Sequence, residues 1–72
     1  MTKTDRAALQ QQGKIIFRSQ INKKSKWDIV QYTVNGGWIK SSPCGCDFKT
    51  REECDAVIDA LAEKNSDIVK DE

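Results

Sequence analysis

Three cysteines are the side chains best suited to chemistry in this chain of 72 residues, which contains no histidine. Cys44 and Cys46 flank a single glycine, and Cys54 follows them. Three thiolates can hold Zn²⁺ with a carboxylate or water as the fourth ligand, but Cys-x-Cys departs from the usual zinc-binding spacing. A disulfide between Cys54 and either of the others is the oxidised alternative. We expect free thiols, no metal and no other cofactor.

Catalysis has little support in this composition. A cysteine without a histidine lacks its usual activating base, and the chain has no glycine-rich phosphate-binding loop. Asp55 and Asp59 stand one helical turn apart, a spacing typical of a solvated helix face. The sequence therefore predicts a protein that is not an enzyme.

A binding function is better supported than catalysis, because basic and acidic residues are concentrated in different parts of the chain. Residues 1–51 carry ten basic and three acidic side chains, a net +7, whereas residues 52–72 carry two basic and eight acidic ones, a net −6. Such a division favours one surface that meets an anionic partner, although small proteins also acquire bipolar surfaces by chance. No apolar run reaches the ~20 residues of a membrane span, and the first residues are too polar for a signal peptide. We expect a cytoplasmic protein with no membrane partner.

Three strands are predicted from residue patterns. Residues 14–21 alternate between two faces, and residues 26–34 are rich in β-branched and aromatic side chains. Residues 22–25 form a polar turn, and Asn35-Gly36 predicts a tight hairpin. The returning strand covers residues 37–41.

One helix is predicted to follow the strands. Thr50 and Glu53 form a capping box in front of an apolar stripe at helical spacing. The stripe consists of Cys54, Val57, Ile58 and Leu61. A short final strand over residues 66–69 completes the predicted elements.

These elements predict an α+β fold: a three-stranded antiparallel β-meander packed on one C-terminal α-helix, with room for a short fourth strand. Residues 14–69 form a single ββ(β)α domain. A tail or short helix over residues 1–13 precedes the domain, and a frayed end over residues 70–72 follows it.

The faces of the sheet depend on the register of its two hairpins. With loops at residues 22–25 and 35–36, Ile21 faces Lys26, and Tyr32 faces Ile15 in one neighbouring strand and Ile39 in the other. Opposed residues share a face. The face for the helix then holds Ile15, Phe17, Val30, Tyr32, Val34 and Ile39. The other holds Ile16, Arg18, Gln20, Trp27, Ile29, Gln31, Thr33, Trp38 and Lys40.

The run KSKWDIVQYTVNGGWI…FKTREECDAVIDALAEKN resembles the three-stranded, helix-backed DNA-binding domains of phage-type tyrosine recombinase N-termini and plant ethylene-response factors. The likeness spans residues 14–65 and rests on Trp27 opening a strand, the hairpin at 35–37 and the helix entry at 48–53. In that family the free sheet face enters the DNA major groove. The resemblance implies such contacts from Arg18, Trp27, Trp38 and Lys40. The Cys-Gly-Cys loop, the acidic helix and Cys54 depart from the family pattern.

The sequence thus predicts a small non-enzymatic nucleic-acid-binding module, with DNA preferred, in which basic groups meet phosphate and tryptophan stacks. A protein-interaction or inhibitor module using the same face is the alternative. The expected binding residues are Arg18, Gln20, Lys23, Lys24, Lys26, Trp27, Trp38 and Lys40. A three-residue loop at 35–37 would instead turn Trp38 inward beside Val34, and residues 1–12 folded over the sheet would cover the tryptophans.

Overall fold

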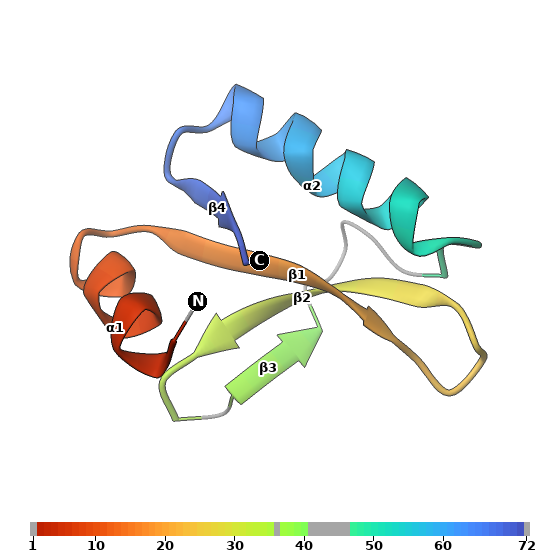
Figure 1. Cartoon of the computed structure of the whole chain (residues 1–72), viewed down its shortest axis with the longest axis horizontal. Coiled ribbons are helices and arrows are strands. Elements are labelled where there is room, and N and C mark those ends of the chain that lie inside the picture. Colours follow the sequence, from red (N-terminus) through yellow and green to blue (C-terminus); the bar gives the residue numbers. More distant parts are fainter. Residues whose placement is uncertain (1, 36, 41–46, 72) are drawn as a thin grey trace.

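The strands form one mixed sheet flanked by two helices. The computed structural model describes residues 2–35, 37–40 and 47–71. Within these ranges the elements are α1 (Lys3–Gln11), β1 (Ile15–Ile21), β2 (Trp27–Thr33), β3 (Gly37–Lys40), α2 (Arg51–Lys64) and β4 (Ile68–Lys70). The strand order is β3-β2-β1-β4, with β1 to β3 antiparallel and β4 parallel to β1 (Figure 1). The α+β class is confirmed, and the short fourth strand is present as β4. It pairs parallel to β1, so the sheet is mixed and not an antiparallel meander alone.

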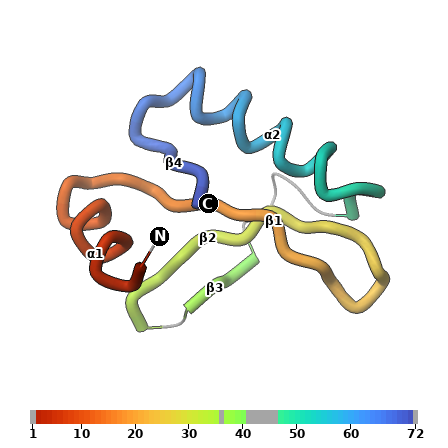
Figure 2. Tube along the Cα trace, in the orientation of Figure 1, coloured from red at the N-terminus to blue at the C-terminus, as the bar shows by residue number. Residues whose placement is uncertain are grey.

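The two helices lie on opposite sides of the sheet (Figure 1, Figure 2). On one face α2 packs against the strands, and Phe17 and Ile29 meet Cys54 and Ile58 in a buried cluster. On the other face α1 packs against β1, and Gln10 donates from Nε2 to the Tyr32 carbonyl at 3.0 Å. The N-terminal helix therefore covers part of the sheet face that was expected to be free.

Local signals set the ends of the helices. The Thr50 hydroxyl accepts the Glu53 N–H at the start of α2, which is one of the two hydrogen bonds of the capping box that the sequence predicts. Thr2 and Asp5 exchange hydrogen bonds in a capping box that begins α1. Gly13 follows α1 with a φ of +82° and turns the chain into β1. In the described part of the chain, neither helix has the length and apolar character that crossing a bilayer requires.

The register of both hairpins differs from the prediction by one residue. Ile21 pairs with Trp27 instead of Lys26, and Tyr32 pairs with Trp38 instead of Ile39. Each shift turns β2 over relative to one neighbour, because side chains alternate between faces along a strand. The two shifts together leave β1 and β3 on their predicted faces and invert β2 alone.

The inverted strand separates the two tryptophans. Trp27 and Ile29 lie on the face covered by α2. Val30, Tyr32 and Trp38 lie on the opposite face, so the predicted packing of Val30 and Tyr32 under α2 is wrong, although both are buried. Two further residues expected under the helix are exposed, namely Val34 and Ile39.

Turn conformation explains the shift at the first hairpin. The Asn22 side-chain oxygen accepts the backbone N–H groups of Lys24 and Lys26, and Ser25 adopts a left-handed φ of +61°. Asn22 also donates its own N–H to the Lys26 carbonyl at 2.7 Å, which leaves residues 23–25 as the loop. At the second hairpin Gly37 has a φ of +67° and begins β3. In each hairpin, one end of the connecting loop therefore lies one residue from the position assumed from sequence.

Cys54 is the cysteine that the described residues include, whereas Cys44 and Cys46 lie outside them. Within the described ranges, no group of three or more metal-ligating side chains comes together. Cys54 lies in α2, its side chain is fully buried between the helix and the sheet, and burial raises the pKa of its thiol. The absence of a metal and of disulfides in the whole protein stays a prediction.

We expect the buried Cys54 thiol to react with iodoacetamide on the order of 100 times more slowly in the native protein than in the unfolded one, because alkylation needs an exposed thiolate. Peptide-resolved mass spectrometry with and without guanidinium chloride measures both rates. Equal rates would place Cys54 at the surface and contradict the packing of α2.

Candidate nucleic-acid interface

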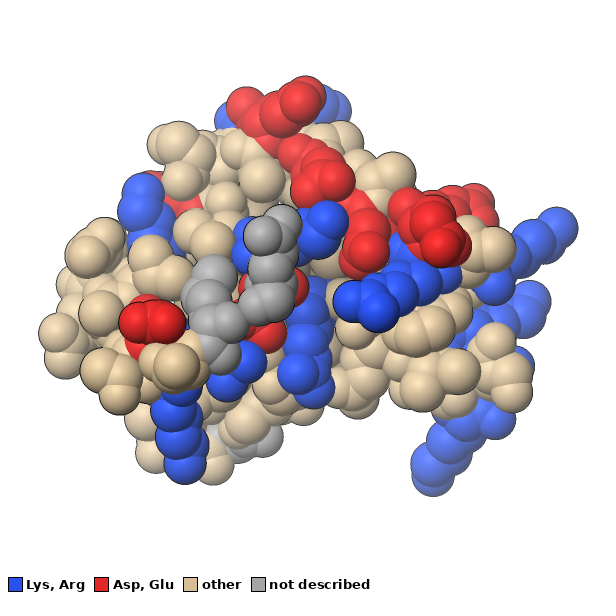
Figure 3. Space-filling model, viewed as in Figure 1, with Lys and Arg blue, Asp and Glu red and all other residues tan. Residues whose placement is uncertain are grey.

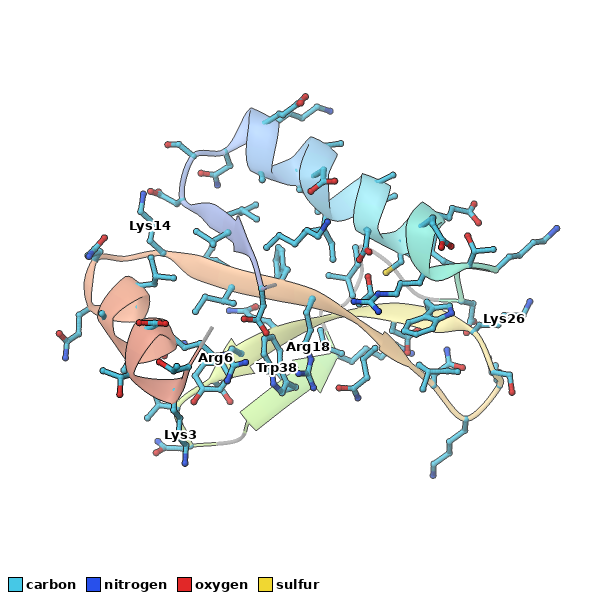
Figure 4. All side chains as sticks on the ribbon, in the orientation of Figure 1. Lys3, Arg6, Lys14, Arg18, Lys26 and Trp38 are labelled. Atoms are coloured by element: carbon cyan, nitrogen blue, oxygen red, sulfur yellow. The ribbon has the colours of Figure 1, made fainter. Side chains whose placement is uncertain are left out.

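Trp38, Arg6 and Arg18 lie close together on the face of the sheet that α1 partly covers (Figure 4). The guanidinium carbon of Arg18 lies 4.1 Å from the centroid of the Trp38 ring, and that of Arg6, from α1, lies 5.3 Å away. Tyr32 meets the same indole edge-on, with ring centroids 5.2 Å apart. These four side chains, Arg6, Arg18, Tyr32 and Trp38, are called the Arg–Trp cluster below.

Strand pairing brings the cluster together. Tyr32 and Trp38 are paired across β2 and β3, and Val30 is paired with both Arg18 and Lys40. Because paired residues point to the same side of a sheet, Arg18, Trp38 and Lys40 project from one face. The sequence predicted this shared face for these three residues, and the register confirms it.

The two arginines of the cluster have different partners. Arg6 Nη2 lies 3.0 Å from Asp71 Oδ2, and the two side chains are only 18% and 7% exposed. Arg18 Nη2 donates to Gln20 Oε1 at 3.2 Å. Among the described residues, no carboxylate lies within ion-pair distance of Arg18. Of the two arginines in this cluster, Arg18 is therefore the one that is available to bind an anion.

Lysines continue the basic surface along the β1–β2 hairpin. Lys23, Lys24 and Lys26 are exposed at its turn, and Figure 4 shows Lys26 at the end of the molecule away from α1. The Lys24 ammonium lies 3.3 Å from Asp47 Oδ2. Partial desolvation raises the pKa of Asp47, but hydrogen bonds from Lys24 and Asn22 outweigh it and lower the pKa below its ordinary value. The predicted lysines thus lie at the hairpin end of the molecule, apart from the Arg–Trp cluster, and Lys24 is already paired.

A buried carboxylate, missed by the sequence reasoning, supports this hairpin. Asp28 is buried, and its Oδ1 accepts hydrogen bonds of 2.9 Å from Asn22 Nδ2 and from the Asp47 backbone N–H. Its Oδ2 lies 3.9 Å from the Lys40 ammonium. Asp28 therefore fixes the hairpin against the segment that precedes α2 and offsets part of the positive charge of Lys40.

Trp27 does not join the Arg–Trp cluster. It lies on the α2 face, where its backbone exchanges two hydrogen bonds of 2.9 Å with Phe48. The guanidinium carbon of Arg51, at the start of α2, lies 6.0 Å from the Trp27 ring centroid. The prediction that both tryptophans share one binding face is wrong, because it depended on the face assigned to β2.

The division of charge in the sequence is also a division in space. Figure 3 shows acidic side chains gathered along α2 and basic side chains over the sheet and the hairpin end. The acidic residues of α2 are Glu52, Glu53, Asp55, Asp59 and Glu63. A polyanion would be attracted to the sheet side and repelled from the helix side.

No family model, curated protein or solved structure matches this chain. The resemblance to recombinase and ethylene-response domains stays a prediction. Both α1 and β4 lie outside residues 14–65, on which that likeness rests.

Proposed function

We propose that this chain is a small, non-enzymatic nucleic-acid-binding module, with DNA preferred, and that it binds through the face that carries the Arg–Trp cluster. The observation that carries the proposal is Arg18, stacked on Trp38 and without a carboxylate partner in the described part of the chain. A stacked guanidinium keeps its edge donors available, and its planar donor geometry matches phosphate.

Trp38 acts in this proposal as the support for Arg18. The guanidinium lies over the indole at 4.1 Å, so that face of the ring is already occupied. Tyr32 meets the indole edge-on, and the Arg6 guanidinium lies 5.3 Å from the ring centroid. Fixing Arg18 before binding lowers the entropy lost when it pairs with a phosphate.

The hairpin lysines supply further phosphate contacts. Lys23, Lys24 and Lys26 extend the positive surface beyond Arg18 and Gln20. Such contacts give affinity without sequence specificity and release counterions, so binding falls steeply with salt. The acidic α2 on the far side of the sheet favours approach of a polyanion by the basic face alone.

A titration with a short fluorescein-labelled duplex and with its single strand tests the proposal. Raising the salt from about 50 to about 200 mM should weaken binding at least about 10-fold, because the counterions that several phosphate contacts release then contribute less to the free energy of binding. Failure to bind either nucleic acid at the lower salt would remove the proposal. Binding that does not change with salt would also contradict it, and a protein partner at the same face would then be the better candidate.

A further inference from the structure

The N-terminal helix α1 has little apolar contact with the sheet. None of its nine residues, all of which the structure describes, is buried, and Leu9 is its one half-buried apolar side chain. A groove of about 450 Å³ remains between the helix and the end of β2, lined by Lys3, Thr4, Ala7, Tyr32 and Val34. A helix of this length has little stability by itself. The position of α1 therefore depends on its polar contacts with the rest of the protein.

Those polar contacts come from Arg6 and Gln10. Arg6 Nη2 lies 3.0 Å from Asp71 Oδ2, and Gln10 Nε2 donates to the Tyr32 carbonyl at 3.0 Å. Arg6 Nε and Gln10 Oε1, however, are buried and have no hydrogen-bond partner among the described residues. A buried polar atom without a partner destabilises the state in which it is buried. The docked position of α1 thus depends on the Arg6–Asp71 ion pair and carries a cost that undocking removes.

The connection to β1 allows α1 to leave the sheet while the strands stay paired, because it consists only of residues 12–14. The Gly13 N–H bonds to the Gln10 carbonyl and the Lys14 N–H bonds to the Leu9 carbonyl, each at 3.0 Å. This is the Schellman arrangement, which needs a left-handed residue at the position of Gly13. Gly13 has a φ of +82°, and a Cβ atom added there would lie in open space. One glycine conformation therefore sets the direction in which α1 returns to the sheet.

Aromatic side chains lie under α1. Tyr32 is only 9% exposed, and the Arg6 guanidinium carbon lies 5.4 Å from its ring centroid and 5.3 Å from that of Trp38 (Figure 4). Undocking of α1 would take this guanidinium away from both rings. Arg18 would remain beside Trp38, because it belongs to β1. Exposed aromatic rings next to a cation are the kind of surface on which unpaired bases stack.

We infer that α1 is a lid over a stacking surface for single-stranded nucleic acid, and that the Arg6–Asp71 ion pair keeps this lid closed. When the lid opens, unpaired bases stack on Tyr32 and on the part of Trp38 that Arg18 leaves uncovered. Arg6 then exchanges the Asp71 carboxylate for a phosphate, which its planar donors also fit. Bases inside a duplex are stacked on one another and do not reach this surface. The inference rests on the proposed nucleic-acid binding and adds to it the kind of strand that is bound and a closed state that limits binding.

Two variants that open the lid by different means test the inference. Asp71→Asn removes the charge that holds Arg6 and keeps the size of the side chain. Gly13→Ala leaves the net charge unchanged and makes the left-handed turn after α1 unfavourable. Because a mostly closed lid lowers the observed affinity by the fraction of open molecules, both variants should bind a fluorescein-labelled single strand about 5-fold more tightly than the wild type. Their affinity for the duplex should stay within about 2-fold of the wild type, since phosphate contacts to Arg18 do not require an open lid.

Asp59→Asn is the matched control for the change of charge in Asp71→Asn. Asp59 is exposed on α2 and lies 3.5 Å from the Lys70 ammonium, so its replacement should alter either affinity by less than about 2-fold. Hydrogen exchange measured by mass spectrometry follows the lid in the free protein. The amides of residues 3–13 should exchange about 5-fold faster in Asp71→Asn and in Gly13→Ala, while those of β1 to β3 should keep their rates.

The outcomes separate the lid from the proposed function. If the wild type binds nucleic acid and neither variant gains affinity for the single strand, or both gain equally for the duplex, the inference is overturned and the proposed function stands. Unchanged exchange in α1 would also overturn the inference, because neither the ion pair nor Gly13 would then hold the helix. Absence of binding by the wild type and by both variants at about 50 mM salt would remove the proposed function and the inference together. If circular dichroism shows that one variant is unfolded, the other decides, since the two loosen α1 independently.

Discussion

Replacing Ile58 by alanine is expected to lower the free energy of unfolding by about 2–5 kcal/mol. Ile58 is completely buried and packs in the cluster with Phe17, Ile29 and Cys54. A domain of this length has a total stability of only about 4–10 kcal/mol, so the variant should be close to unfolding at room temperature. Urea denaturation followed by circular dichroism measures the change in midpoint.

Val34→Ala is the matched control, because it also shortens an aliphatic side chain. Val34 is 71% exposed, so this change should alter the free energy of unfolding by less than about 0.5 kcal/mol. The register assumed from sequence would instead have buried Val34 under the helix. A loss of stability in Val34→Ala as large as that in Ile58→Ala would therefore favour the assumed register over the observed one.

Replacing Arg18 by glutamate is expected to weaken DNA binding about 10- to 100-fold at low salt and to reduce the salt slope by at least about one unit. The substitution removes the guanidinium stacked on Trp38 and places a carboxylate in its position. Fluorescence anisotropy with the labelled duplex, at two salt concentrations, measures both quantities.

Lys64→Glu is the control for net charge. Lys64 lies in the last turn of α2 and is exposed, and its replacement changes the total charge by the same amount as Arg18→Glu. Only long-range repulsion should weaken its binding, and that effect is screened within about 10 Å at 0.1 M salt. Equal affinities for the two variants would mean that the position of Arg18 is unimportant.

Local sequence signals predicted most of the elements, but not the face of β2. The cap at Thr50 marked the start of α2 correctly, and the three antiparallel strands lie where residue patterns placed them. In β2, however, Trp27 and Ile29 alternate with Val30 and Tyr32, so both faces carry apolar side chains. The reason is that both faces are covered, one by α2 and the other in part by Arg6 and Gln10 of α1, which contact Tyr32. A strand covered on both faces has no polar side to reveal its orientation.

The orientation of β2 also explains why only part of the candidate site was predicted. Arg18 and Trp38 were placed together because β1 and β3 kept their faces when the two register shifts cancelled. Trp27, on the inverted strand, was misplaced. Arg6 reaches Trp38 from α1, and no spacing in the sequence connects the two residues. Contacts between elements that are distant in the chain leave no local pattern from which to infer them.

The junction between the two ends of the chain has a consequence for folding kinetics. The ion pair between Arg6 and Asp71 joins residues 65 positions apart, and β4 adds a parallel pairing between Ile15 and Ile68. The β1–β3 meander, by contrast, forms from short hairpins. Closing the larger loop costs chain entropy before its contacts form, which raises contact order and slows folding. The meander can therefore nucleate early, while docking of α1 and β4 makes the barrier depend on almost the whole length of the chain.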